Sequence, residues 1–151
     1  MSISVINNQH KNRLGKIIGI YLLLSAAAVA VDQIYGLFSH GVDSAAMTWM
    51  FLYPLLGGAF YYFIFGKLIP DLAQRPGFRL LLNLHSSGIG TLTAASFLQG
   101  VFEIAGTDSP HLTYYYGIGI VFIIAGFVIL AGICQNRSFN SGKPGPKEEQ
   151  P

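Results

Sequence analysis

The sequence predicts an all-α, polytopic membrane protein with four transmembrane helices in an antiparallel bundle. Of the 151 residues, 52% are hydrophobic and only 11% are charged, which leaves too little polar surface to cover a water-soluble globule of this size. Four apolar segments are each long enough to cross a bilayer. All nine lysines and arginines fall into three clusters, and the apolar segments separate these clusters from two loops that carry no basic residue.

The positions of the basic clusters also predict the orientation. They lie at residues 11–16, 67–79 and 137–147, and cytoplasmic loops of membrane proteins are enriched in lysine and arginine. We therefore expect a multi-pass protein of the plasma (inner) membrane, with both termini cytoplasmic (N-in/C-in). Because the basic residues line one membrane face instead of forming a patch, no nucleic-acid partner is expected, and the lipid bilayer is the expected environment.

The first span is expected at about residues 14–38, after a cytoplasmic N-terminal tail of residues 1–13. Backbone groups in hydrocarbon must be hydrogen-bonded within their own segment, so the span must be helical. A cleaved signal peptide is the alternative, because basic residues precede the apolar run and residues 28–30 fit an A-x-A cleavage site. Apolar residues up to Phe38 complete a membrane-length helix, which favours the transmembrane interpretation.

The second span is expected at about residues 46–69. Trp49 and Tyr53 lie near its outer end, where an interfacial aromatic belt is typical. Pro54 should kink this helix, and the glycines at 57 and 58 give the kink room. The span is therefore expected to be helical but interrupted.

The third and fourth spans are expected at about residues 78–104 and 112–134. A Pro-Gly turn at residues 76–77 separates the third span from the second. The tail at 135–151 is polar and rich in proline and glycine, so we expect it to be disordered and cytoplasmic. The connecting loops are too short for a second domain.

Span three carries most of the candidate functional residues. At about 100° per residue, one side of this helix collects several polar side chains: His85, Ser96, Gln99 and Glu103. Such a stripe is typical of a solute path or a proton relay. Helix packing is the favoured alternative, because Ser86, Gly90 and Ala94 form a small-xxx-small series. We therefore expect Gly90 to lie where two helices approach most closely.

Asp32 is the remaining intramembrane polar candidate. It lies roughly 22 Å along the helix axis from Ile17, close to the outer headgroups. Gln99 or Glu103 of span three could meet it there, and a pair of carboxylates at one point would hold a proton or a cation. The alternative, that Asp32 only reaches the interface, is equally compatible with the sequence.

The histidines do not predict a metal or haem site. Two histidines and two acids share the outer level and could hold a divalent ion: His40, Asp43, Asp108 and His111. Helix capping explains the acids without a metal, because Asp43 or Ser44 fits the N-cap of span two and Asp108 or Ser109 fits that of span four. His85 is alone at its depth, whereas a bis-histidine haem needs two ligands. No cofactor is expected.

The stretch HSSGIGTLTAASFLQGVFEIAGTDSP, together with IYGLFSHGVDS, resembles small four-span integral membrane proteins of bacteria. The resemblance covers most of residues 14–134. It implies a bacterial plasma membrane as the location and carries no activity with it.

Soluble-enzyme motifs such as H-E-x-x-H or G-x-S-x-G are absent from the sequence. We therefore expect a non-enzymatic protein that acts through helix–helix contacts, as a subunit or accessory of a membrane assembly or as a homo-oligomer. The alternative is a small oligomeric transporter or proton-coupled permease that uses the polar stripe. A haem or quinone redox protein is the third hypothesis.

Overall fold

The computed structural model describes residues 3–38, 43–69 and 72–141, with side chains from residue 13 to residue 135 of these ranges, and every regular element in them is helical. In chain order the elements are α1 (Ile3–Phe38), α2 (Ala45–Thr48), the π-helix η1 (Tyr53–Phe60), α3 (Tyr61–Leu68), the 3-10 turn η2 (Leu72–Gln74), α4 (Phe78–Ile104) and α5 (Leu112–Ser141). The predicted all-α class is confirmed for the described residues.

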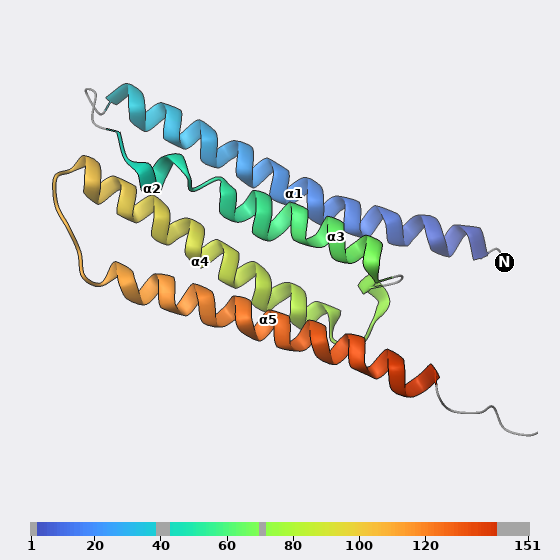
Figure 1. Cartoon of the computed structure of the whole chain (residues 1–151). Coiled ribbons are helices and arrows are strands. Elements are labelled where there is room, and N and C mark those ends of the chain that lie inside the picture. Colours follow the sequence, from blue (N-terminus) through green and yellow to red (C-terminus); the bar gives the residue numbers. More distant parts are fainter. Residues whose placement is uncertain (1–2, 39–42, 70–71, 142–151) are drawn as a thin grey trace, which may run out of the picture.

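Four long helical segments lie side by side in a row, and neighbours run antiparallel (Figure 1). The α1 helix packs on the composite second segment formed by α2, η1 and α3. This segment also packs on α4, and α4 packs on α5. A closed bundle would bring α1 and α5 together, whereas here they occupy opposite edges of the row.

Three stretches of the described residues are long and apolar enough to cross a membrane: Arg13–Phe38, Ala45–Leu68 and Leu112–Gln135. The expectation of four apolar spans is therefore confirmed for three. The α4 helix has 27 residues and is about 40 Å long, but it is less apolar than the others. It lies inside the row, where neighbouring protein contacts its polar side chains.

The second segment is broken near Pro54, as the sequence predicts. The α2 helix ends at Thr48, and the π-helix η1 begins one residue before Pro54. Proline lacks an amide hydrogen and clashes with the preceding turn, so a widened helical turn accommodates it. Gly57 and Gly58 provide more than room for a kink. A Cβ on Gly57 would collide with Ile89 of α4, and one on Gly58 would collide with the Tyr21 ring of α1.

Two helices are longer than the sequence suggested. The α1 helix begins at Ile3, inside the expected N-terminal tail of residues 1–13. The α5 helix continues to Ser141, so the expectation that the tail is disordered from residue 135 is wrong for its first residues. An established helix gains one backbone hydrogen bond for each residue added, which favours its extension into a polar segment. Residues 142–151 lie outside the described residues.

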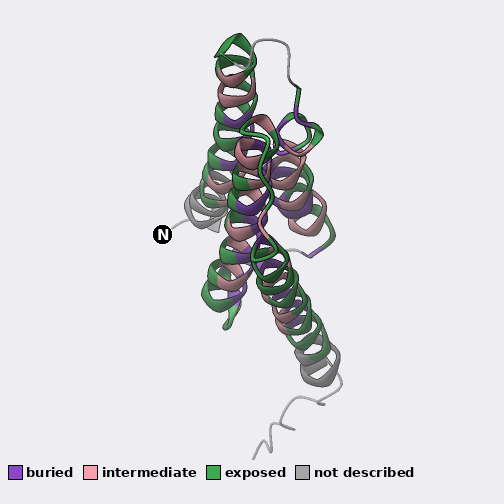
Figure 2. Ribbon diagram, turned by 90° about the vertical axis from the view of Figure 1, so that its left-hand side faces the viewer, coloured by how far each residue is buried: buried purple, intermediate pink, exposed green. Residues whose placement is uncertain are grey.

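The main core lies where the second segment meets its neighbours, and buried residues follow the inner faces of the helices (Figure 2). Its most deeply buried members include Tyr62, Leu72, Phe78 and Leu81. A smaller cluster around Met47 and Met50 packs the opposite end of the row.

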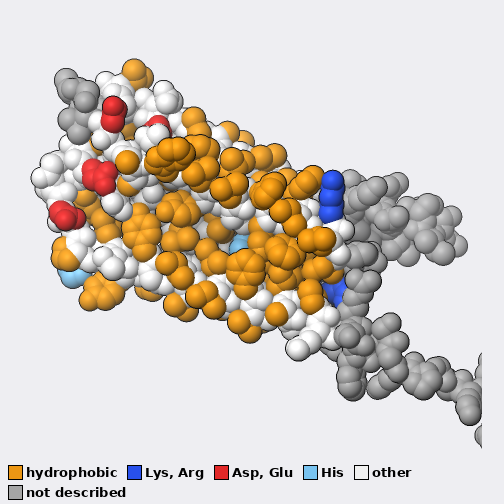
Figure 3. Space-filling view, in the orientation of Figure 1, with side chains coloured by type: hydrophobic (Ala, Val, Ile, Leu, Met, Phe, Trp, Pro, Cys, Tyr) orange, Lys and Arg blue, Asp and Glu red, His pale blue; other side chains and the backbone are white. Residues whose placement is uncertain are grey.

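The two ends of the row carry opposite charges. Figure 3 shows acidic side chains at one end, basic side chains at the other, and a wide hydrophobic surface between them. The acids with described side chains are Asp32, Asp43, Glu103 and Asp108. The cations with described side chains are Arg13, Lys16, Lys67, Arg75 and Arg79. We call these the acidic end and the basic end.

Candidate functional site: a groove between α1 and α4

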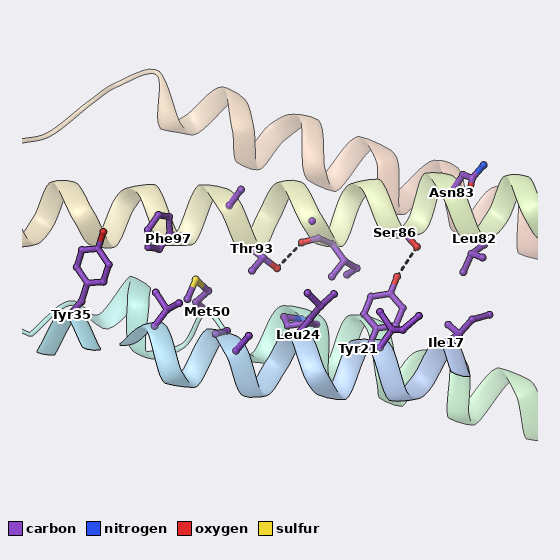
Figure 4. A pocket seen from close by; sticks show the side chains of 18 residues that line it. Ile17, Tyr21, Leu24, Tyr35, Met50, Leu82, Asn83, Ser86, Thr93 and Phe97 are labelled. Atoms are coloured by element: carbon purple, nitrogen blue, oxygen red, sulfur yellow. Dashed lines mark hydrogen bonds between the residues drawn. The ribbon is translucent and has the colours of Figure 1, made fainter. Parts of the chain in front are cut away.

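An apolar groove of about 760 Å³ lies between α1 and α4, with residues of the second segment as its floor (Figure 4). The α1 wall extends from Ile17 to Tyr35, and the α4 wall from Leu82 to Phe97. Pro54 lies in the floor. The α1 and α4 backbones are separated here, and side chains alone bridge them.

Two contacts cross the groove near its ends. At the end nearer the basic residues, the Tyr21 hydroxyl and the Ser86 hydroxyl are hydrogen-bonded at 2.7 Å. At the other end, the Tyr35 and Phe97 rings meet edge to face with their centroids 5.6 Å apart. Along α1 these contacts are about four turns, or about 21 Å, apart. Between them the groove is open at the surface.

The small-residue series of α4 lines this groove, with Ser86, Gly90 and Ala94 among the lining residues. A Cβ on Gly90 would have no other atom within 4 Å. The expectation that Gly90 marks a close helix–helix contact is therefore wrong within this chain. At about 100° per residue, a residue two positions from Gly90 points to nearly the opposite side of the helix. The close contact of α4 lies on that opposite face.

The close contact is formed by three glycines between α4 and α5, which we call the α4–α5 seam: Gly88, Gly119 and Gly126. A Cβ on Gly88 would lie 2.9 Å from the backbone oxygen of Gly119. One on Gly126 would lie 3.3 Å from Cβ of His85. The seven-residue spacing of the two α5 glycines was the sequence signal that could have identified this contact.

The polar residues in the middle of α4 bond to the second segment. His85 is only 1% exposed, and its Nε2 lies 2.7 Å from the Gly57 carbonyl oxygen. Because a carbonyl only accepts, Nε2 is the donor, and the described residues give Nδ1 no partner. The ring stacks on Tyr61 with centroids 4.0 Å apart. Likewise, the Ser96 hydroxyl donates to the Ala46 carbonyl at 2.6 Å.

The remaining stripe residues form a network at the acidic end. The Gln99 amide donates to Glu103 at 3.0 Å and accepts from the Tyr116 hydroxyl at 2.7 Å. The Ser44 hydroxyl donates to the other Glu103 carboxylate oxygen at 2.5 Å. The structure thus connects Gln99 and Glu103 to α5 and to the start of α2.

Asp32 is not paired with this network. Its described hydrogen bond comes from the Thr48 hydroxyl, at 3.4 Å. Glu103 instead bonds to Ser44 and Gln99, so the first of the two alternatives for Asp32, a pairing with Gln99 or Glu103, is not formed among the described residues. The reason is the short α2 helix, which contacts both α1 and α4 at this level.

One of the two predicted helix caps is present. Ser44 is the N-cap of α2, and its hydroxyl accepts from the Met47 amide at 3.2 Å. At the start of α5, the Asp108 carboxylate accepts from the amide of Ser109 at 2.8 Å, and the Leu112 amide donates to the Ser109 carbonyl at 3.2 Å. These bonds form a turn ahead of α5 instead of a side-chain cap.

The residues considered for an outer metal site can be followed only in part, because His40 lies outside the described residues. Asp43 is exposed, and His111 stacks on Tyr114 with centroids 6.3 Å apart. In the part of the chain that the structure describes, histidine, cysteine and acidic side chains form no group of three suited to a metal.

No protein-family model, curated protein or solved structure matches this chain.

Proposed function

We propose that this chain is a four-span integral protein of a bacterial plasma membrane that acts through helix–helix contacts, as a subunit or accessory of a membrane assembly. The observation that carries this proposal is the open groove between α1 and α4. Its proposed occupant is a transmembrane helix of a partner protein.

The internal bonding of α4 supports a fourth span. The helix lies between the second segment and α5, which both contain apolar, membrane-length stretches (Figure 1). Polar groups within a bilayer must be satisfied by protein, and the Nε2 atom of His85, the Ser96 hydroxyl and the Gln99 side chain have protein partners. Four antiparallel crossings then place both termini at the basic end, which is the cytoplasmic side by the enrichment of basic residues there.

The lining of the groove favours a helix as the occupant. Small residues allow two helix backbones to approach closely in lipid, where packing drives association. Ser86, Gly90 and Ala94 supply such a face, and the described chain leaves space above Gly90. At the rim of the groove, the Asn83 side chain is exposed and has no hydrogen-bond partner among the described residues. Its amide can bond to a polar group of a partner helix, which an acyl chain would not offer.

The alternative, a small transporter or proton-coupled permease, requires the polar stripe to line a water-filled path. The protein contacts of His85 and Ser96 favour a structural role for these residues. A haem protein would need an available imidazole nitrogen that faces a cavity. Instead, His85 Nε2 bonds to Gly57. Nδ1, which has no described partner, is buried against α5, where a Cβ on Gly126 would lie 3.4 Å from it. Both alternatives therefore rank below the helix-docking proposal.

Site-specific photo-crosslinking in native membranes tests the groove. A photoreactive residue at Ala94, in the groove, should give a protein adduct of discrete mass. The same residue at Val128, which is 66% exposed on α5, should give none. An adduct at twice the chain mass would identify a second copy as the partner. Adducts with lipid alone at Ala94, or equal protein adducts at both positions, would contradict the proposal.

A bulkier side chain on the α4 wall of the groove provides the matched control for that experiment. Gly90→Leu should abolish the Ala94 adduct without lowering the melting temperature of the purified protein, because the new side chain enters open space. Gly117→Leu also adds a side chain where nothing lies within 4 Å, but on α5. It should leave the adduct in place and, like Gly90→Leu, should not lower the melting temperature. An adduct that survives Gly90→Leu would argue against a close-packed helix in the groove.

Cysteine labelling tests the orientation. In a Cys134→Ser background, cysteines introduced at Gly106 and Thr107 should react with a membrane-impermeant reagent from outside the cell. A cysteine at Pro76 should react only after the membrane is permeabilised. The reverse pattern would overturn the proposed topology.

A further inference from the structure

A second pocket, of about 450 Å³, opens at the basic end between α1, η2 and the start of α4. Three arginines line it: Arg13 from α1, Arg75 just after η2, and Arg79 in the first turn of α4. We call it the arginine pocket. It is separate from the groove and has a different chemical character.

A tight turn places two of these arginines at one rim. The Phe78 amide donates to the Arg75 carbonyl at 3.1 Å, and Gly77 has φ 90° and ψ −14°. With proline at position 76, this is a type II turn, which needs glycine at its third residue. Leu72 and Phe78 are 0% and 2% exposed, so both sides of the turn are anchored in the core.

Several donors around the pocket have no described hydrogen-bond partner. The Nε atom of Arg75 is buried and has no hydrogen-bond partner among the described residues. Gly77, the N-cap of α4, has no side chain that could bond to the first-turn amides. The Phe78 and Leu81 amides have backbone partners, whereas the amide of Arg79, which lines the pocket, has no described partner. The positive end of a helix favours an anion at this point.

We propose that the arginine pocket binds a phosphate group. A guanidinium presents a planar fork of donors that matches phosphate oxygens, and uncapped helix amides bind the same group. The pocket volume lies in the range of small-ligand sites and exceeds that of a phosphate ion. On the proposed topology, the pocket lies at the level of the cytoplasmic headgroups, where two sources offer this chemistry. One is the headgroup of an anionic phospholipid, and the other is free phosphate.

Binding of phosphatidylglycerol to the full-length protein, measured by native mass spectrometry or in nanodiscs, tests the proposal. Arg75→Gln should weaken this binding about tenfold or more, the typical loss for one charge-assisted hydrogen bond. Lys67→Gln is the matched control, because it removes one charge from the same end. Lys67 is exposed, and its ammonium group lies 4.5 Å from the centroid of the Phe63 ring, outside the pocket. It should weaken binding less than about twofold, as expected for an exposed charge.

Inorganic phosphate separates the two sources. If a lipid headgroup is the ligand, phosphatidylglycerol should raise the melting temperature in an Arg75-dependent manner, and millimolar phosphate should do so weakly or only compete. If phosphate alone gives the Arg75-dependent rise, free phosphate is the source. Equal losses in Arg75→Gln and Lys67→Gln would show nonspecific charge attraction and overturn the site.

Two further variants keep the experiment decisive. If Arg75→Gln fails to fold, Arg79→Gln removes an exposed arginine from the same pocket and should give the same loss. Asp71, the acid of this loop, lies outside the described residues. Asp71→Asn should leave phosphate binding unchanged. Binding that appears only in Asp71→Asn would mean that this carboxylate occupies the pocket in the native chain, and the proposal would be wrong.

Discussion

The two flanks of α4 use small residues in opposite ways. On one flank, Gly88 lies in the α4–α5 seam, where an added Cβ would lie 2.9 Å from the Gly119 oxygen. On the other flank, Gly90 lies in the groove, where an added Cβ would contact nothing within 4 Å. Of two glycines two positions apart, Gly88 thus lies in a close helix–helix contact and Gly90 lies in an open groove.

The difference shows what a small-residue face does in a membrane protein. Lipid is as apolar as a leucine side chain, so packing, rather than escape from water, draws helices together. The seam already obtains this packing from α5. The groove has the same small residues without a helix of this chain against them, and for this reason we propose that a partner helix docks there.

The largest effect is expected for Gly88→Ala. The new methyl group would overlap the backbone of α5, which cannot rotate away as a side chain can, so the helices must separate. Overpacking of this kind costs up to about 3 kcal/mol. Gly90→Ala is the paired control on the same helix, and it should gain up to about 1 kcal/mol from helix propensity. Equal melting temperatures in detergent for these two variants would show that the seam is not packed more closely than the groove.

His85→Leu should have the next largest effect. The substitution removes the donor to the Gly57 carbonyl and the stacked ring against Tyr61. A buried carbonyl left without its partner costs about 2 kcal/mol. Asn83→Leu, at the exposed rim of the groove, should change stability little. A larger loss for Asn83→Leu than for His85→Leu would mean that the open flank contributes more to the fold than the closed one.

Tyr21→Phe should have a smaller effect, because it removes only the hydroxyl that bonds to Ser86 across the groove. Hydrogen bonds between membrane helices contribute about 1 kcal/mol. The ring stacking on Tyr62, with centroids 5.7 Å apart, remains. Tyr35→Phe is the matched control, because the described contact of Tyr35 with α4 is made by its ring. If the two variants melt alike, the Tyr21 hydroxyl does not hold the groove together.

Asp32→Leu should have the smallest effect, less than about 0.5 kcal/mol. The Thr48 hydroxyl that contacts Asp32 at 3.4 Å also bonds to the Ser44 carbonyl at 3.0 Å, so it keeps a partner. Ser44→Ala is a useful reference, since it removes a helix cap and the bond to Glu103 and should cost about 1 kcal/mol. A loss from Asp32→Leu as large as that of Ser44→Ala would mean that Asp32 has a structural partner after all.

The sequence predicted the ends of several elements because local chemistry determines them. The third span was expected at residues 78–104, and α4 occupies Phe78–Ile104. The fourth was expected to begin at Leu112, where α5 begins. The Pro-Gly turn before α4 and the effect of Pro54 also depend only on nearby residues, so composition and spacing were sufficient for them.

The sequence could not show which face of α4 meets which neighbour. Gly88 and Gly90 are equally small, and only the positions of α1 and α5 assign one to a contact and the other to a groove. The suggested pairing of Asp32 with Gln99 or Glu103 is absent for a related reason. The break in the second segment leaves a short helix, α2, which contacts both α1 and α4 and separates Asp32 from Glu103. The periodicity of a single helix cannot predict that a third helix lies between two others.

The linear order of the helices has a consequence for how the chain is made. Each segment of the row packs on the segment that precedes it in the sequence, so a helix leaving the ribosome finds its partner already in the bilayer. Contacts close in sequence form quickly, because little loop entropy is lost when they form. The α1 edge is in place before α5 is synthesised, and the groove is complete once α4 has docked. On the proposed topology, the partner that we propose for the groove can engage the nascent chain before α5 is inserted.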